Sequence, residues 1–242
     1  MLPLKDDIPT ERTPVVTIGL IALNILVFLY QMSLGPHQQA FIYALGVVPF
    51  EITNNIDLVP RITLPLKSTL LTSMFIHGGL FHLFGNMLYL WIFGNNVEDV
   101  MGRFRFLLFF LVCGLAATYS QIYMNPASRI PMVGASGAVS GVLGAYLLLY
   151  PKARVLTVIF LGFFVQIIRV PALIVLSFWI VVQVISGTAA LSTGHTAGVA
   201  WFAHIGGFVS GLVLLKLFLA RRSRTSLNLN PFRAGRHHGS KD

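Results

Sequence analysis

The stretch that decides the fold is residues 134–150, which read GASGAVSGVLGAYLLLY. It carries no charge, and small residues recur at Ser136, Ser140, Gly141 and Gly144. Residues four apart lie on the same face of a helix. A face of small side chains lets two membrane helices approach closely. The stretch therefore predicts a tightly packed membrane helix with a serine hydroxyl in its first turn.

The composition of the whole chain agrees with a membrane location. Of its 242 residues, 55% are hydrophobic and only 10% are charged, and the mean hydropathy is +0.78. A soluble domain carries roughly 25% charged residues. The net charge of +9 is concentrated after the last apolar segment, as in a cytoplasmic anchor on anionic lipid, so we expect membrane lipids and no nucleic acid as partners.

The apolar segments predict an all-α polytopic bundle with six transmembrane helices. A bilayer span needs about 20 mostly apolar residues. The expected helices are 15–34, 80–97, 104–124, 135–150, 170–187 and 198–220. Residues 155–168 are too few for a span and have basic residues at both ends, so we predict an interfacial or re-entrant segment there.

The basic residues predict that both termini are cytoplasmic. With six spans, three Lys or Arg residues fall on the outer side, whereas the inner side holds Lys5, Arg12, Arg103, Arg105, Lys152, Arg154, Arg169, Arg221, Arg222, Arg224, Arg233, Arg236 and Lys241. This distribution obeys the positive-inside rule. We expect a cytoplasmic segment over 1–14, a membrane domain over 15–220 and a disordered basic tail over 221–242. Residues 1–14 contain acids and resemble neither a signal nor a transit peptide. We expect a multi-pass protein of a prokaryotic cell (inner) membrane.

Three polar clusters fall at the starts of expected helices. One contains His77, His82 and Asn86, the second is Gly-Ala-Ser-Gly at 134–137, and the third contains His204. All three segments run from outside to inside, so the clusters share one depth near the outer leaflet. Polar groups at membrane depth often mark a functional site.

These residue types favour nucleophilic chemistry. A serine hydroxyl needs a base to take its proton, and histidine is the usual one. Ser136 begins a helix, where free backbone N–H groups can bind an oxyanion. His82 and Asn86 are four residues apart and can both donate hydrogen bonds. No acidic residue lies near the outer leaflet in any expected span, so a Ser136–His204 dyad is predicted rather than a Ser-His-Asp triad.

In these motifs the chain closely resembles the rhomboid family of intramembrane serine proteases. The resemblance rests on His-x4-His-x3-Asn ending at Asn86, Gly-Ala-Ser-Gly at 134–137 and Ala-His-x-x-Gly at 203–207. It implies that Ser136 is the nucleophile and His204 the base, and that His82, Asn86 and the Ser136 N–H stabilise the oxyanion. It gives structural roles near the site to His77, Gly134, Gly137, Ser140 and Glu98, and Glu98 resembles an acid that ties the cytoplasmic side together.

The resemblance further implies cleavage of single-span membrane proteins near one membrane face, without a cofactor or metal. The segment 170–187 and the loop 187–199 would form a gate and a cap. The chain departs from some relatives by having Ser140 where an aromatic residue stacks on the base, so we expect Ser140 or a nearby Phe to orient His204. Two rival functions remain: a proteolytically inactive relative that binds membrane segments, and a transporter.

Overall fold

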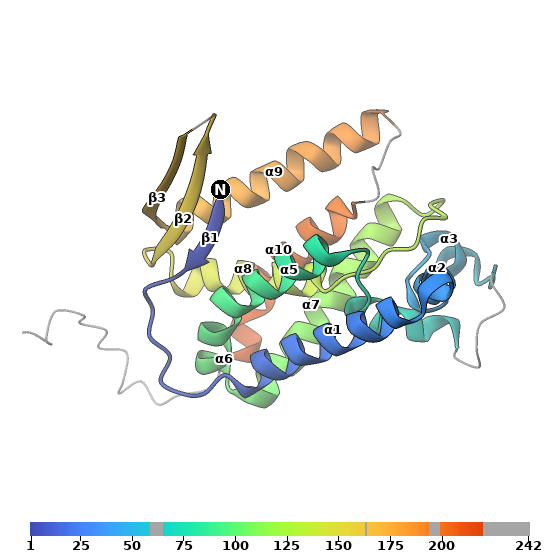
Figure 1. Ribbon diagram of the computed structural model, residues 1–242, viewed down its shortest axis with the longest axis horizontal. Coiled ribbons are helices and arrows are strands. Elements are labelled where there is room, and N and C mark those ends of the chain that lie inside the picture. The colour runs from blue at the N-terminus through green and yellow to red at the C-terminus, as the bar shows by residue number, and fades with distance from the viewer. Residues whose placement is uncertain (59–64, 163, 194–198, 220–242) are drawn as a thin grey trace, which may run out of the picture.

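The computed structural model describes residues 1–58, 65–162, 164–193 and 199–219. The predicted basic tail, the end of the last predicted helix and residues 194–198 of the predicted cap loop lie outside these residues. The described chain is mostly helical (Figure 1).

Four helices are long and apolar enough to cross a membrane. They are α1 (Val15–Ser33), α7 (Arg103–Met124), α9 (Ala172–Thr193) and α10 (Trp201–Phe218). Their mean hydropathies range from 1.6 to 2.1. The chain is therefore a multi-pass membrane protein.

Two further helical stretches correspond to the other predicted segments. The first runs without a break through α5 (Leu80–Tyr89), the π-helical turn η4 (Leu90–Gly94) and α6 (Asn95–Met101). The second is α8 (Ser136–Leu149), which is shorter. Ten consecutive residues of α8, 137–146, are buried, so this helix lies at the centre of the bundle.

The core surrounds α8 with aromatic side chains from neighbouring helices. Its largest fully buried members include Phe93, Phe106, Phe109 and Phe110 around α8, and Tyr146 of α8 itself. The Phe93 and Tyr146 rings meet edge to face, with centroids 4.8 Å apart. This packing holds α8 against η4 and α7 and fixes where its first residue lies.

Short helices occupy much of the described part of the long connection between α1 and α5. They are η1 (Gly35–His37), α2 (Gln38–Leu45), α3 (Pro49–Asn54), η2 (Leu66–Ser68), α4 (Thr69–Thr72) and η3 (Ser73–Phe75). In Figure 1, α2 and α3 lie at the opposite end of the molecule from the strands.

The prediction of an all-α fold is wrong, because the chain also forms a three-stranded antiparallel sheet. Its strands, in the order β1-β2-β3, are β1 (Leu2–Lys5), β2 (Arg154–Leu161) and β3 (Phe164–Pro171). Strands β2 and β3 pair along their whole length.

The predicted interfacial or re-entrant segment 155–168 is therefore a β-hairpin. The run from Val155 to Ile159 is mostly β-branched, which favours strands. Gly162 follows with a φ of 62°, a conformation that glycine adopts without strain. Because β3 extends to Pro171, α9 begins two residues later than expected, and it continues to Thr193, well into the predicted cap loop.

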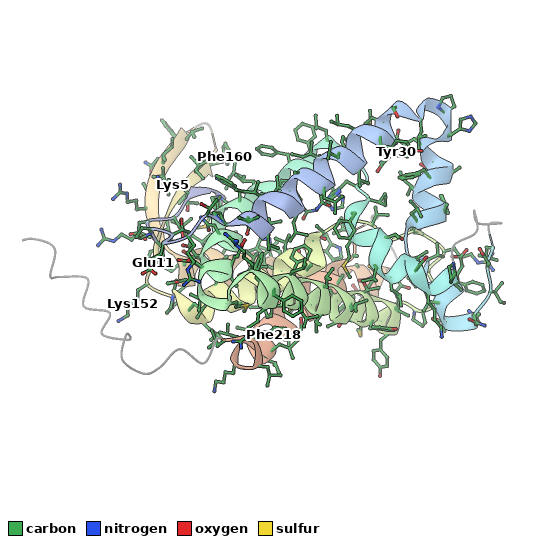
Figure 2. All side chains as sticks on the ribbon, turned by 90° about the horizontal axis from the view of Figure 1, so that it is seen from below. Lys5, Glu11, Tyr30, Lys152, Phe160 and Phe218 are labelled. Carbon is green, nitrogen blue, oxygen red and sulfur yellow. The ribbon has the colours of Figure 1, made fainter. Side chains whose placement is uncertain are left out.

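Hydrogen bonds connect the end of the molecule that carries the β-sheet to the helical bundle. The buried carboxylate of Asp6 accepts hydrogen bonds from the Tyr146 hydroxyl and the Asn96 amide, both at 2.6 Å. Figure 2 shows Lys5, Glu11 and Lys152 at this end, away from Tyr30 at the far end of α1. Lys5 and Lys152, two of the basic residues predicted to be cytoplasmic, thus lie at the same end of the structure.

Candidate active site

A cavity of about 850 Å³ opens among α5, α8, α9 and α10. The residues that line it include Ser136, His204, His82 and Asn86, together with Trp179. The structure thus brings the three polar clusters of the sequence to one place, at the N-terminal ends of three different helices.

Ser136 and His204 are in direct contact. The Ser136 Oγ atom lies 2.9 Å from His204 Nε2, although the two residues are 68 positions apart. Ser136 is the first residue of α8, and His204 lies in the first turn of α10. A serine hydroxyl at this distance from an imidazole nitrogen can pass its proton directly to the ring.

Glycines let α8 and α10 approach closely enough for this contact. A Cβ atom added to Gly211 would lie only 2.7 Å from the backbone carbon of Gly141, and one added to Gly207 would lie 2.9 Å from that of Gly137. The tight packing predicted for residues 134–150 is confirmed, and its partner is the glycine-bearing face of α10. Gly137 also faces α7, since a Cβ there would lie 2.5 Å from the Ala117 Cβ.

His82 and Asn86 face the cavity from α5. In the described part of the chain, the buried Asn86 Nδ2 atom has no hydrogen-bond partner. Gly134, with a φ of 121°, lies beside both residues: a Cβ there would be 2.6 Å from His82 Cε1 and 3.6 Å from Asn86 Nδ2. The glycine leaves room for these two donors next to the serine.

His77 is fully buried and packs against one of these two residues, His82. Its ring meets the His82 ring edge to face, with centroids 5.2 Å apart. Gln31 of α1 donates to the His77 carbonyl at 2.7 Å. These contacts hold the segment that leads into α5.

Glu98 does not lie near the site, contrary to its grouping with the residues there. It belongs to α6, at the opposite end of the helical stretch that carries His82. Its carboxylate accepts hydrogen bonds from the Val16 and Thr17 amides at 3.0 and 2.7 Å, and from the Thr17 hydroxyl at 2.8 Å. A carboxylate on the first-turn amides stabilises the start of α1.

The residue that contacts the far side of the His204 ring is Gln183 of α9. Its Oε1 atom lies 2.7 Å from His204 Nδ1. The expectation that Ser140 or a Phe has this role is wrong, because the Ser140 hydroxyl donates to the Ser136 carbonyl within its own helix, at 2.6 Å. The rings beside His204 are those of Trp179 and Trp201, with centroids 5.9 and 6.2 Å away.

Sequence reasoning missed two glutamines at this site. Besides Gln183, Gln121 of α7 accepts hydrogen bonds from the amides of Phe202 and Ala203, at 3.1 and 3.3 Å, and so caps the start of α10. Both lie in apolar helical segments, where a polar side chain is itself a signal of a specific partner.

The fold and the site define a multi-pass membrane protein with a serine–histidine pair in a cavity. A family profile described as "Rhomboid domain" matches residues 67–221. The chain belongs to the rhomboid family.

Relatives in several organisms share part of this sequence. RHOMBOID-like protein 1 of Arabidopsis thaliana is 34% identical over 152 residues, which cover 63% of this chain and 34% of that protein. The mitochondrial Rhomboid protein 1 of Saccharomyces cerevisiae is 33% identical over 39% of this chain and 28% of that protein. Rhomboid protease GluP of Bacillus subtilis is 42% identical over 32% of this chain and 15% of that protein. The chain thus spans about a third or less of the length of these relatives.

Proposed function

We propose that this protein is an intramembrane serine endopeptidase that cleaves transmembrane segments of other membrane proteins. The observation that carries the proposal is the 2.9 Å contact between Ser136 Oγ and His204 Nε2 inside a cavity that an extended peptide could enter. The family includes a relative named as a protease, Rhomboid protease GluP.

The reaction follows from the geometry of the pair. The Ser136 oxygen attacks a substrate carbonyl carbon as His204 Nε2 takes the hydroxyl proton. The resulting tetrahedral intermediate collapses when the C–N bond breaks, and the imidazolium gives the proton to the leaving amine. Water then attacks the acyl-enzyme with His204 as base, which releases the carboxylic acid and restores the serine.

Donors near Ser136 stabilise the negative charge of the intermediate. We assign this role to the Asn86 side-chain amide, the His82 ring and the Ser136 backbone N–H. Among the residues that the structure describes, Asn86 Nδ2 has no hydrogen-bond partner, and this supports the assignment, since a buried donor without a partner is costly unless a ligand completes it. The start of α8 supplies a free N–H because the first amides of a helix lack intrahelical acceptors.

The cut lies near the outer leaflet if the chain crosses the membrane six times with both termini in the cytoplasm. Besides the four long helices, we include residues 80–101, which at 1.5 Å per residue can cross a hydrocarbon core of about 30 Å. We also include α8, which is surrounded by protein rather than lipid. Figure 2 shows Lys5 and Lys152 at the end of the molecule away from Tyr30, and the positive-inside rule places such residues in the cytoplasm, which supports this orientation.

We propose single-span membrane proteins as substrates. A regular helix hides its carbonyls in hydrogen bonds, so part of the substrate must unwind to present one to Ser136. Gly lowers the stability of a helix by about 1 kcal/mol relative to Ala, and Pro by about 3 kcal/mol. Segments with such residues at their outer end should therefore be preferred.

The prediction of a prokaryotic cell membrane stays a prediction, because the relatives compared include a mitochondrial and a plant protein as well as one from Bacillus subtilis. Fractionation of cells that express the tagged chain from its own gene tests this location.

The proposed activity is tested by co-reconstituting the full chain with a single-span protein in lipid vesicles. The wild type should release two fragments, whereas Ser136→Ala should lower the rate on the order of 10⁶-fold, as for other serine nucleophiles. If the wild type captures the substrate without cutting it, the chain is instead an inactive rhomboid protein that binds membrane segments. Equal cleavage by Ser136→Ala would exclude Ser136 as the nucleophile.

A further inference from the structure

Gln183 is a buried polar residue in an otherwise apolar part of α9. It is 6% exposed, whereas its neighbours Val182 and Val184 are exposed. An amide in a membrane helix is unfavourable unless its donor and acceptor groups find partners. The side-chain amide of Gln183 therefore needs specific hydrogen-bond partners.

Both polar atoms of the Gln183 side chain have partners. The Nε2 atom donates to the carbonyl of Trp179, one turn earlier in α9, at 3.3 Å. The Oε1 atom lies 2.7 Å from His204 Nδ1. Gln183 thus connects α9 to the imidazole that contacts Ser136.

The Trp179 carbonyl decides which way the Gln183 amide faces. A carbonyl oxygen can only accept a hydrogen bond, so it requires the NH₂ group of the amide on its side. The amide oxygen is left for His204. Since an amide oxygen can also only accept, the hydrogen between it and His204 must be carried by Nδ1 of the ring.

This contact determines the tautomer of His204. A neutral imidazole with its hydrogen on Nδ1 has an unprotonated Nε2. In this structure Nε2 is the atom that lies 2.9 Å from Ser136 Oγ. The opposite tautomer would present an N–H to the serine and could not take its proton.

We infer that Gln183 is a positioning residue that holds His204 in the base-competent tautomer, so that Ser136, His204 and Gln183 form a Ser-His-Gln triad. The inference rests on the proposed function of the Ser136–His204 pair. A neutral amide can orient the ring, as the Asn of Cys-His-Asn proteases does, without the high cost of a carboxylate at membrane depth.

Because Gln183 lies on α9, the geometry of the triad also depends on where this helix lies. Ser136, His204 and Gln183 come from α8, α10 and α9 respectively. Figure 1 shows α9 at the edge of the bundle rather than at its centre. Alignment of the base therefore depends on the position of α9, and a displacement of this helix would withdraw the acceptor from His204.

The test compares three variants of the full chain in detergent micelles, with a single-span peptide as substrate. Gln183→Leu removes the hydrogen-bond acceptor of His204, and Gln183→Glu keeps a side-chain oxygen at the same distance from the backbone. Thr188→Val is the matched control, because Thr188 lies on the exposed side of α9 and its hydroxyl donates to the carbonyls of Val184 and Ile185 in its own helix. Thermal unfolding of each variant reports whether it folds.

We expect Gln183→Leu to lower kcat about 10²-fold, the loss typical of a misplaced catalytic group, with KM changed less than twofold. Gln183→Glu should recover part of this loss, and Thr188→Val should match the wild type. A wild-type kcat in folded Gln183→Leu would overturn the inference.

A second measurement does not depend on activity or on any Gln183 variant folding. The ¹⁵N NMR spectrum of imidazole-labelled protein, with the His204 signals assigned by their loss in His204→Ala, reports which ring nitrogen carries the hydrogen. We expect Nδ1–H in the wild type, and Nε2–H in the wild type would overturn the inference. If the NMR result is Nδ1–H but no Ser136-dependent cleavage occurs, the proposed function fails and the role of Gln183 in fixing the ring stands.

Discussion

The Oγ atom of Ser136 lies 2.9 Å from Nε2 of His204, and this contact joins the first turns of two helices that pack through glycine. The pair lies in a cavity rather than in the solid core, Asn86 is among the residues that line this cavity, and within the described residues its buried Nδ2 atom has no hydrogen-bond partner. A nucleophile, a base and a free donor are therefore available to one substrate carbonyl.

Removing an oxyanion donor should lower turnover strongly without unfolding the protein. Asn86→Ala and His82→Ala should each reduce kcat roughly 10²–10³-fold, the effect of losing one such donor. Asn24→Ala is the matched control, because Asn24 is also a buried membrane amide, but it bonds to Leu20 within α1 and is not among the residues that line the cavity. Unchanged turnover in both variants would leave His82 and Asn86 with structural roles alone.

The α8–α10 contact should not tolerate a side chain at Gly207. A methyl group there would meet the backbone of Gly137, so Gly207→Ala should lower stability by about 1–3 kcal/mol through overpacking and reduce cleavage as His204 moves from Ser136. Gly19→Ala is the control, since nothing lies within 4 Å of a Cβ at that position of α1. Melting temperatures and cleavage rates measure both effects, and equal behaviour of the two variants would contradict this packing account.

Stability should depend on pH through Asp6. Burial raises the pKa of this carboxyl above its ordinary value of 3.8, although the hydrogen bond from Tyr146 acts in the opposite direction. The folded protein therefore holds this proton more tightly than the unfolded chain. The resulting contribution to stability is fully present below pH 3.8 and is lost as the pH rises through the folded-state pKa.

Asp6→Asn should remove the loss of stability at higher pH, because asparagine stays neutral and its side-chain oxygen can still accept a hydrogen bond from the Tyr146 hydroxyl. The melting temperature of the wild type should fall relative to that of Asp6→Asn as the pH rises from below 3.8 toward neutrality. Asp57→Asn, at an exposed carboxylate in the connection between α1 and α5, is the control, because Asp57 is not among the groups that shift the pKa of Asp6. Parallel curves for the wild type and Asp6→Asn would show that burial does not act on Asp6 in this way.

Substrate selection should follow the ease of unwinding. A single-span substrate whose outer half is converted to a leucine-rich helix should be cut more slowly, and restoring Gly or Pro in that half should restore the cut. Fragment yields at matched insertion measure this. Equal yields from both substrates would mean that another feature of the segment controls selection.

Much of this architecture follows from the sequence, because a bilayer requires long apolar helices and places polar groups where they have partners. The depth of His82, Ser136 and His204 predicted their meeting. The hairpin over 155–168 escaped prediction because a short apolar run fits either a strand or a buried helical segment, and the β-branched residues before Gly162 were the distinguishing feature. Gln183 escaped because it belongs to no motif, and its partner lies on another helix.

The central claim, that His204 activates Ser136, is tested most directly by mass spectrometry after reaction with a fluorophosphonate. The account predicts a single phosphonate adduct on the peptide that contains Ser136, with Ser136 as the modified residue. The adduct should disappear in His204→Ala and persist in Ser140→Ala, whose serine lies one turn away in the same helix. An adduct absent from the wild-type Ser136, or formed equally well in His204→Ala, would contradict the account.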